Sequence, residues 1–386
     1  MQNPKELLMQ FRQAAGLKLI AITGGPCGGK STFLKMAIAL LQKHGFKVVV
    51  VSEVARELIA SGLAPWDPKW KTSIAFQRQV FLGILTKEYW LLQSVTNMDL
   101  DGQQVVFLCD RGYPDGMAYS GEDQFIAMLS NWGLKLTDVL DHYAGVIHML
   151  TAAHGAEEFY VTDAERMETP EQARERDDLL RNAWLQHQHQ IVVDNSGAFS
   201  DKINRALEAL RRILKMPTPQ EIEVKFRVYD FSLGQVPGDA KFYNIEQTYL
   251  ERPDRPGIEC RVRKREVARS SSYFYTEKTS TDVVGVRAEH EEIIDETHYN
   301  AFIAAWKKPG TCTVFKTRYK FHHGSSVAEL DVYQGNLKGL VMLEIELPNV
   351  EAMGTLALPG QFKLVDKTAD KRYSNASLAE HGIPEE

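Results

Sequence analysis

The chain has 386 residues, of which 44% are hydrophobic and 25% are charged, and its formal net charge is -6. This length exceeds that of a typical single domain, so we expect two domains with separate cores. The mildly acidic charge does not favour a nucleic-acid-binding protein, and no apolar run is long enough to span a bilayer. The chain shows no secretory signal and its four cysteines lack CxxC spacing, which predicts a cytoplasmic protein with reduced thiols. The oligomeric state cannot be inferred from these features.

Residues 17–216 alternate short hydrophobic runs with longer segments of helical periodicity. The runs do not alternate with polar residues, which is typical of strands that are buried on both faces. The five predicted strands are 18–23, 47–52, 105–109, 145–150 and 190–194. Helical patterns separate them, and a last helix is predicted at about 200–215. This order predicts a parallel α/β/α sandwich.

Residues 23–32 read TGGPCGGKST and follow the first predicted strand directly. They contain the GxxxxGK[ST] pattern of a P-loop (Walker A), in the strand-to-helix context that this motif requires. Backbone N–H groups of such a loop wrap phosphates at the positive end of the helix. The terminal phosphates are the predicted target of Lys30, and a magnesium ion that of the Ser31 hydroxyl. The predicted nucleotide-binding residues are Gly24, Gly25, Gly28, Gly29, Lys30, Ser31 and Thr32.

Two carboxylates follow the second and third predicted strands, namely Glu53 and Asp110. We expect both beside the P-loop, because ligands of open α/β sheets bind at the carboxyl ends of the strands. Asp110 is placed like a Walker B carboxylate that holds magnesium, although a capping role at the strand end is the alternative. Glu53 could act as a general base on an acceptor hydroxyl in a kinase reaction, or could simply pair with Arg56 or Arg111.

The segment 154–182 is polar and rich in both charge signs. In a P-loop kinase, a lid at this point would bring an arginine to the phosphoryl group during transfer. Arg174 and Arg176 are the candidates. A solvated helix with ion pairs between neighbouring turns is the alternative.

Residues 17 to about 200 resemble the NadR/Ttd14-type AAA domain family, small P-loop NTPases with a kinase-like architecture. The resemblance rests on GGPCGGKST, on SEVARELIASG with Glu53 and Arg56, on CDRG with Asp110, and on the W..H.....VDN pattern that ends at Asn195. It implies binding of ATP or GTP, and the sequence does not distinguish the two.

After KMPTPQ (215–220) the pattern changes to strands with a period of two. One helical segment, 298–308, interrupts them. The change predicts a second domain over 217–386 that is antiparallel and mainly β. The eight predicted strands are 221–228, 243–250, 259–266, 272–279, 287–294, 313–322, 328–335 and 340–347.

The first of these strands, EIEVKFRV, places Glu221, Glu223, Lys225 and Arg227 on one face. Later strands repeat the charged face, but most carry a single sign, whereas a solvated sheet would mix signs. A closed barrel with a basic wall for a polyanion and an acidic wall for a divalent metal explains this, because the ligands neutralise the enclosed charges. For any single residue, a structural salt bridge is the alternative. The single-sign sets are Arg261, Arg263 and Arg265; Lys316, Arg318 and Lys320; Glu289 and Glu291; Glu329 and Asp331; Glu344 and Glu346.

Residues 220–386 resemble the CYTH, or triphosphate tunnel metalloenzyme, family. The ExExK signature corresponds to Glu221, Glu223 and Lys225, and the later charged pairs and the segment DKTADKRYSN (366–375) follow in the order of the family. The resemblance implies an eight-stranded antiparallel tunnel barrel that binds a triphosphate with Mg²⁺ or Mn²⁺. The implied phosphate-binding residues are Lys225, Arg261, Arg263, Lys278, Lys316 and Arg318. The implied metal ligands are Glu221, Glu223, Glu329, Asp331, Glu344 and Glu346.

Three functions are compatible with this combination of domains. The first is a metal-dependent triphosphatase that acts on a nucleoside triphosphate or inorganic triphosphate, with the P-loop domain as a second nucleotide site or a kinase. The second is a GTP- or ATP-regulated binding protein whose basic tunnel captures a phosphoinositide or another polyanion. The third is a small-molecule or nucleoside kinase that uses the P-loop domain. The first is favoured, because a tunnel for anion binding alone would not need Glu221, Glu223, Glu344 and Glu346 together. The predicted catalytic residues are Lys30, Glu53 and Asp110 in the P-loop domain, and Glu221, Glu223 and Lys225 in the tunnel domain.

Overall fold

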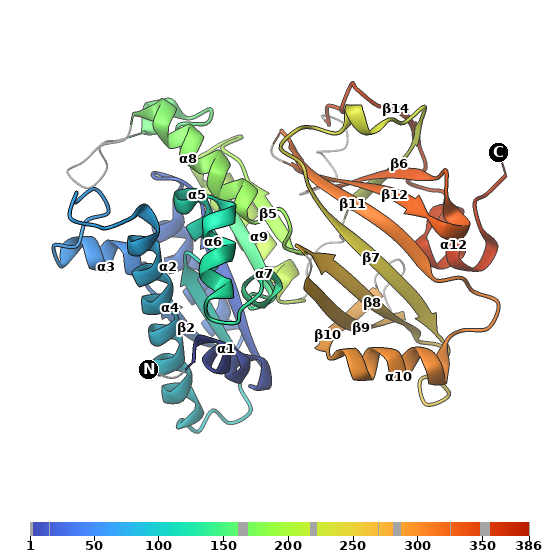
Figure 1. Ribbon diagram of the computed structural model, residues 1–386, viewed down its shortest axis with the longest axis horizontal. Helices are drawn as coiled ribbons and strands as arrows, with labels where there is room; N and C mark the ends of the chain where they lie inside the picture. The colour runs from blue at the N-terminus through green and yellow to red at the C-terminus, as the bar shows by residue number, and fades with distance from the viewer. Residues whose placement is uncertain are drawn as a thin grey trace. The chain divides into compact units, whose positions relative to one another are not determined.

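The computed structural model describes residues 3–14, 16–160, 169–216, 222–268, 270–280, 287–324, 326–347 and 356–385. The chain divides into two compact units, Met1–Thr218 and Pro219–Glu386, which are described separately (Figure 1). In the part of the chain that is described, no helix combines the length and apolar character needed to cross a membrane.

The N-terminal unit is built on a five-stranded parallel sheet with the strand order β2-β3-β1-β4-β5. The strands are β1 (Leu17–Thr23), β2 (Lys47–Val51), β3 (Val105–Asp110), β4 (Gly145–Met149) and β5 (Gln190–Val193). Strand β4 is buried throughout and β3 is buried except at Asp110, as expected for a sheet covered on both faces. The predicted parallel α/β sheet is therefore confirmed.

Helices cover both faces of this sheet. Phe33 of α2 and Ile203 of α9 pack into one core with alternate residues of β1, β3 and β4. Phe107 of β3 points to the opposite face and contacts Phe11 of α1, with ring centroids 6.0 Å apart. The α-helices of the unit are α1 (Pro4–Gln13), α2 (Lys30–Lys43), α3 (Val54–Ala60), α4 (Ser73–Thr96), α5 (Met117–Ser120), α6 (Glu122–Ser130), α7 (Leu136–Leu140), α8 (Pro170–Ala183) and α9 (Phe199–Ile213). Two short 3₁₀ helices are η1 (Tyr113–Gly116) and η2 (Glu157–Phe159).

The C-terminal unit contains an antiparallel sheet with the strand order β10-β9-β8-β7-β11-β12-β13-β6-β14. Its strands are β6 (Ile222–Tyr229), β7 (Lys241–Leu250), β8 (Glu259–Val267), β9 (Ser270–Ser280), β10 (Arg287–Ile294), β11 (Val314–His323), β12 (Ser326–Gln334), β13 (Val341–Leu347) and β14 (Lys363–Asp366). Strands β6 to β13 correspond to the eight predicted strands, and the short β14 adds a ninth beside β6. The helices are α10 (Glu296–Trp306) and α12 (Asn375–His381), with 3₁₀ turns η3 (Leu233–Gln235), η4 (Gly335–Leu337) and η5 (Lys371–Tyr373).

The strand register places the charged residues of β6, β13, β12 and β11 on one face of the sheet. Lys225 lies opposite Glu344, Glu344 opposite Glu329, and Arg318 opposite Asp331. Residues opposite each other in an antiparallel pair share a face. The alternate residues of the same strands, such as Phe226, form a hydrophobic core on the other face. The charged face is thus a property of the sheet and not of one strand.

Candidate functional site

The P-loop connects β1 to α2 in a conformation that only glycine accommodates at two positions. Gly24 has a φ of +126°, and a Cβ there would lie 2.0 Å from the carbonyl oxygen of Met149. A Cβ on Gly28 would lie 2.6 Å from the same oxygen. Lys30 Nζ donates hydrogen bonds of 2.9 Å to the carbonyl oxygens of Gly24 and Gly25, so the lysine folds back over the loop. Burial, reinforced by the charge of Arg111, lowers the pKa of Lys30 to about 8.

Glu53 lies at the N-terminus of α3 and pairs with two arginines. Arg111 Nε is 3.4 Å from Glu53 Oε1, and Arg56 Nε is 3.7 Å from Glu53 Oε2. Burial acts to raise the pKa of Glu53, but Arg111 and Lys30 outweigh it and hold this pKa below its ordinary value. Glu53 is therefore ionised at neutral pH, as a proton acceptor must be. The predicted pairing with Arg56 and Arg111 is present, and a catalytic role stays a prediction.

Asp110 ends β3 beside the same loop. Burial, together with the nearby Glu53, raises its pKa above the ordinary value. Its Oδ1 atom is buried and makes no hydrogen bond to the described residues. A carboxylate oxygen in this state fits a Mg²⁺ ligand, and Ser31 lines the same cavity.

A cavity of about 1060 Å³ opens at the P-loop. It is lined by eight predicted site residues: Gly28, Gly29, Lys30, Ser31, Thr32, Glu53, Asp110 and Arg176. Arg174 is not among the lining residues; it donates to the carbonyl oxygen of Ala153 and to Glu171 Oε1, both at 2.9 Å. Arg176 instead places its guanidinium 4.6 Å from the ring centroid of Tyr119 and donates to the carbonyl oxygen of Ala118. Of the two candidate arginines, Arg176 is the one that lines the cavity, and a role in phosphoryl transfer stays a prediction.

The cavity extends well beyond the phosphate-binding loop. Its lining includes a set of aromatic residues, here called the aromatic wall: Trp66, Phe76, Phe81, Tyr113, Tyr119 and Phe125. The cavity is also lined by Asn195, Phe199 and Lys202. Lys202 Nζ donates to the carbonyl oxygen of Leu150 and to Asn195 Oδ1, both at 2.6 Å, and burial lowers its pKa to about 8. Sequence reasoning missed these residues, except Asn195, because no local pattern marks them.

Asp115 organises the segment that follows Asp110. Its Oδ1 accepts hydrogen bonds from Thr23 Oγ1 and from Trp184 Nε1, both at 2.7 Å, and its Oδ2 accepts from the Gly112 N–H at 3.0 Å. Trp184, whose side chain is buried, is the tryptophan of the W..H.....VDN pattern. This contact connects Trp184, which lies far along the chain, to the segment that follows Asp110.

In the C-terminal unit, the basic strand β11 and the acidic strands β12 and β13 neutralise each other. Arg318 Nε is 2.7 Å from Asp331 Oδ1, and Arg318 Nη2 is 3.1 Å from Glu344 Oε2. Lys316 also donates to Asp331, and Arg318 to Glu329. The charges therefore form one network in which a phosphate chain and a cation would each find partners.

Strand β6 contributes Lys225 and Glu223 to this network. Lys225 Nζ is 2.7 Å from Glu344 Oε1 and 3.0 Å from Glu223 Oε1. Burial and the neighbouring Glu344 raise the pKa of Glu223 to about 7. Burial also acts to raise the pKa of Glu344, but Lys225 and Arg318 outweigh it and hold that pKa well below its usual range.

The repulsion between Glu223 and Glu344 is what a divalent cation would relieve, so these two oxygen donors fit a Mg²⁺ or Mn²⁺ site. Glu346 lies opposite Glu223 in the register and is exposed. Glu221 lies outside the described residues. Among the described residues, no three His, Cys, Asp or Glu side chains already form a metal-binding group. The predicted ligand set therefore stays a prediction.

Strand β8 adds the second basic element. Arg263 Nη2 is 2.8 Å from Glu291 Oε2 of β10, and its guanidinium lies 5.2 Å from the ring centroid of Phe274. Arg261 lies opposite Tyr249, and Lys278 opposite Glu259. Two further basic side chains of the charged face, Arg265 and Lys320, are each only 1% exposed. The sequence alternation marks them as members of the face, but they were not among the predicted phosphate-binding residues.

This chain is similar to known proteins of two kinds. A family model described as an AAA domain matches residues 19–202. An inorganic triphosphatase from Nitrosomonas europaea is 34% identical over 161 residues, which are 41% of this chain and 96% of the relative. A crystal structure of an inorganic triphosphatase is 32% identical, covers 44% of this chain and 99% of its own, and has a TM-score of 0.34.

A Hippeastrum protein, described as a putative adenylyl cyclase with a dominant triphosphatase activity, is 13% identical. The match covers 35% of this chain and 83% of that one, with a TM-score of 0.26. The match to the Nitrosomonas europaea relative spans nearly its whole length. The chain therefore belongs to the CYTH family of that inorganic triphosphatase, and it carries a P-loop AAA domain in addition.

Proposed function

We propose that the C-terminal unit binds a triphosphate together with Mg²⁺ or Mn²⁺ and hydrolyses its terminal phosphate, and that the N-terminal unit binds ATP or GTP. One observation carries the first part: the register unites the basic strand β11 and the carboxylates of β12, β13 and β6 on a single face. The kinship to an inorganic triphosphatase supports it. The substrate is inorganic triphosphate or a nucleoside triphosphate.

Binding would exchange ion pairs in the network. Phosphate oxygens would replace the carboxylate partners of Arg318 and Lys316, since guanidinium and ammonium groups bind both kinds of oxyanion. A cation beside Glu223 and Glu344 would share the role that the Lys225 ammonium has in the structure. When bound, it would polarise the terminal phosphate. Water would attack the terminal phosphorus as the bridging P–O bond breaks, which would give phosphate together with diphosphate or, from a nucleoside triphosphate, a nucleoside diphosphate.

The test measures phosphate release from tripolyphosphate with Mg²⁺ or Mn²⁺. We expect Glu223→Gln combined with Glu344→Gln to lose most activity, about 100-fold or more if the cation is no longer held. Lys30→Ala should retain it. The matched control is Glu292→Gln, which changes an exposed carboxylate of the same unit.

Three outcomes would count against the proposal. Hydrolysis by the double variant at the wild-type rate would contradict a triphosphatase in this unit. Loss in Lys30→Ala alone would place hydrolysis at the P-loop. Cation-independent binding of phosphoinositide vesicles without any hydrolysis would favour a binding protein.

The cavity favours a second function for the N-terminal unit. We propose that it transfers the terminal phosphoryl group of ATP or GTP to a hydroxyl of a small molecule held against the aromatic wall. Glu53 would take the hydroxyl proton, and the products would be a nucleoside diphosphate and a phosphate ester. The cavity volume of about 1060 Å³ supports this, because it lies at the upper end of the range for sites that hold a single small ligand.

The test screens nucleosides, sugars and amino alcohols as acceptors and detects the phosphate ester. Trp66→Ala should weaken acceptor binding, because Trp66 lines the cavity and is 60% exposed. Trp90→Ala is the control, since Trp90 is similarly exposed, at 68%, and does not line the cavity. Equal acceptor KM values for the two variants would contradict this acceptor site.

A further inference from the structure

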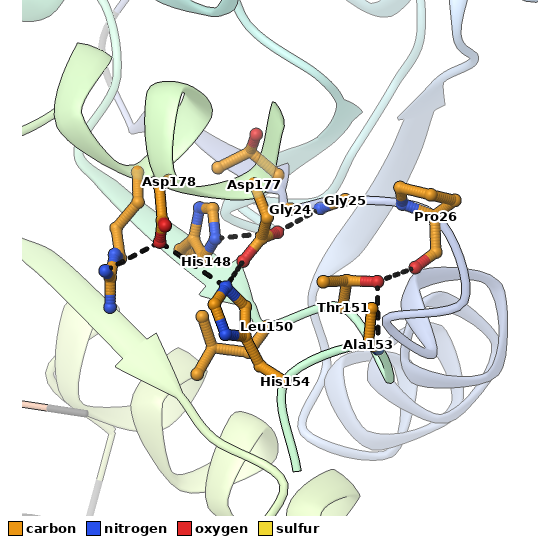
Figure 2. Close-up of polar contacts among 12 residues, drawn as sticks. Gly24, Gly25, Pro26, His148, Leu150, Thr151, Ala153, His154, Asp177 and Asp178 are labelled. Carbon is orange, nitrogen blue, oxygen red and sulfur yellow. Dashed lines mark hydrogen bonds and ion pairs between the residues drawn. The ribbon is translucent and has the colours of Figure 1, made fainter. Parts of the chain in front are cut away.

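A buried carboxylate joins the P-loop to helix α8 (Figure 2). The Asp177 side chain is fully buried, and its Oδ1 accepts a hydrogen bond from the backbone N–H of Gly25. His148 Nε2 from β4, also fully buried, lies 3.2 Å from the same oxygen. The residues that form the contact are 29 and 152 positions from Asp177 in the sequence. The contact is therefore made by the tertiary structure.

The P-loop is packed closely against Asp177, which we call the anchor. A Cβ on Gly25 would lie 2.9 Å from Asp177 Oδ1 and 3.0 Å from Thr151 Cβ. Thr151 Oγ1 also donates a 2.5 Å hydrogen bond to the carbonyl oxygen of Pro26 (Figure 2). The first turn of the P-loop is thus held between the segment after β4 and helix α8.

The anchor is charged. Burial alone would raise the pKa of Asp177, but His148 and the Gly25 N–H stabilise the ionised form and lower this pKa to about 2. Hydrogen bonds to an ionised acceptor are stronger than those between neutral groups. On the outer side, His154 Nε2 lies 4.0 Å from Asp177 Oδ2 and 3.4 Å from Asp178 Oδ1 (Figure 2).

Helix α8 also carries the arginine that reaches the cavity. Arg176 directly precedes Asp177, and successive residues on a helix point about 100° apart. One side chain therefore contacts the P-loop while its neighbour lines the cavity beside Tyr119. A shift of α8 would move both groups together.

We propose that Asp177 is a positioning residue that couples the conformation of the P-loop to the placement of Arg176 over the cavity. The coupling rests on the proposed binding of a nucleotide by the N-terminal unit. When phosphates order the P-loop, the Gly25 contact holds α8 in place. If Asp177 only stabilised the fold, its substitution would lower stability but would not change the effect of nucleotide binding on α8.

The test compares Asp177→Ala, Asp177→Asn and the control Asp178→Asn in the full chain. Asp178 is the next residue of α8; among the described residues it pairs with Arg181 and His154, and neither belongs to the P-loop. Hydrogen exchange is measured for peptides covering 24–31 and 170–183, with and without the Mg²⁺ complex of a non-hydrolysable ATP analogue. Binding affinity is measured in parallel, and thermal melting reports folding.

In the wild type and in Asp178→Asn, we expect the analogue to slow exchange in both peptides. In Asp177→Ala, it should protect 24–31 but not 170–183, and the affinity should fall about tenfold. Asp177→Asn should lie between these limits, because its amide oxygen can still accept the Gly25 hydrogen bond. This variant carries the test if the alanine variant does not fold.

Equal protection of 170–183 in the wild type and the Asp177 variants would overturn the coupling and leave nucleotide binding intact. Absence of protection in both peptides of the wild type would instead overturn the proposed nucleotide binding, and the coupling with it.

Discussion

Arg318 of β11 and Asp331 of β12 meet in a two-point contact across the antiparallel pair. Arg318 Nε is 2.7 Å from Asp331 Oδ1, and Arg318 Nη2 is 2.6 Å from Asp331 Oδ2. Asp331 is fully buried. The planar fork of the guanidinium matches a carboxylate as well as a phosphate. Under the proposed function, an entering triphosphate would therefore compete with an internal anion, and this competition would favour ligands of high charge.

The first prediction concerns this buried anion. Asp331→Asn should destabilise the C-terminal unit by about 3 kcal/mol, because Arg318 and Lys316 lose the charge that compensates their burial. The free energy of unfolding is obtained from urea unfolding of the full chain. Hydrogen exchange in peptides that cover β11 and β12 monitors the unfolding of the C-terminal unit. The control is Asp230→Asn, which breaks an exposed pair with Lys363 and should change stability by less than about 0.5 kcal/mol. Similar effects of the two substitutions would contradict the prediction.

The second prediction concerns the P-loop backbone. Gly24→Ala introduces a Cβ 2.0 Å from the Met149 carbonyl oxygen at a φ of +126°. It should destabilise the N-terminal unit by at least about 2 kcal/mol more than Gly45→Ala does. Gly45 also has a positive φ, but no atom lies within 4 Å of a Cβ there. The measurement is the urea midpoint for unfolding of the N-terminal unit in Gly24→Ala and in Gly45→Ala. Equal midpoints for the two variants would refute the prediction.

The third prediction concerns pH. The pKa of Asp177 is about 2 in the folded chain and 3.8 ordinarily, so the ionised form stabilises the fold. This stabilisation, about 2 kcal/mol, is present above pH 4 and is lost as the pH falls towards 2. The free energy of unfolding of the wild type should therefore exceed that of Asp177→Asn above pH 4, and the difference should shrink below it. A constant difference between pH 5 and pH 2.5 would rule this out.

The fourth prediction concerns metal binding without substrate. A cation that binds the folded C-terminal unit beside Glu223 and Glu344 should stabilise it by about 1.4 kcal/mol at ten times its dissociation constant. Addition of MnCl₂ should raise the melting temperature of the wild type and of Glu292→Gln, and EDTA should reverse the rise. The rise should be smaller in Glu344→Gln. If Glu344→Gln responds as strongly as the wild type, the cation binds elsewhere.

Most of the fold could be predicted from local patterns. The alternation of apolar and charged residues indicates which side chains share a face, and the continuous apolar runs indicate buried parallel strands. The P-loop was recognisable because all of its functional residues lie within ten positions. By contrast, Asp115 and Asp177 meet residues that are 92 and 152 positions away. No periodic pattern records such contacts, so the sequence did not reveal these two residues.

The strand EIEVKFRV shows which features follow from the sequence and which follow from the tertiary structure. Its alternation by itself determined that Glu223, Lys225 and Arg227 share a face, because successive side chains of an extended chain point to opposite sides. The tertiary structure decided their partners: Lys225 meets Glu344, whereas Arg227 donates to the Tyr373 hydroxyl at 3.2 Å and lies 4.9 Å from the ring of Tyr229. These partners depend on strand register and on long-range packing, which side-chain alternation within one strand does not encode.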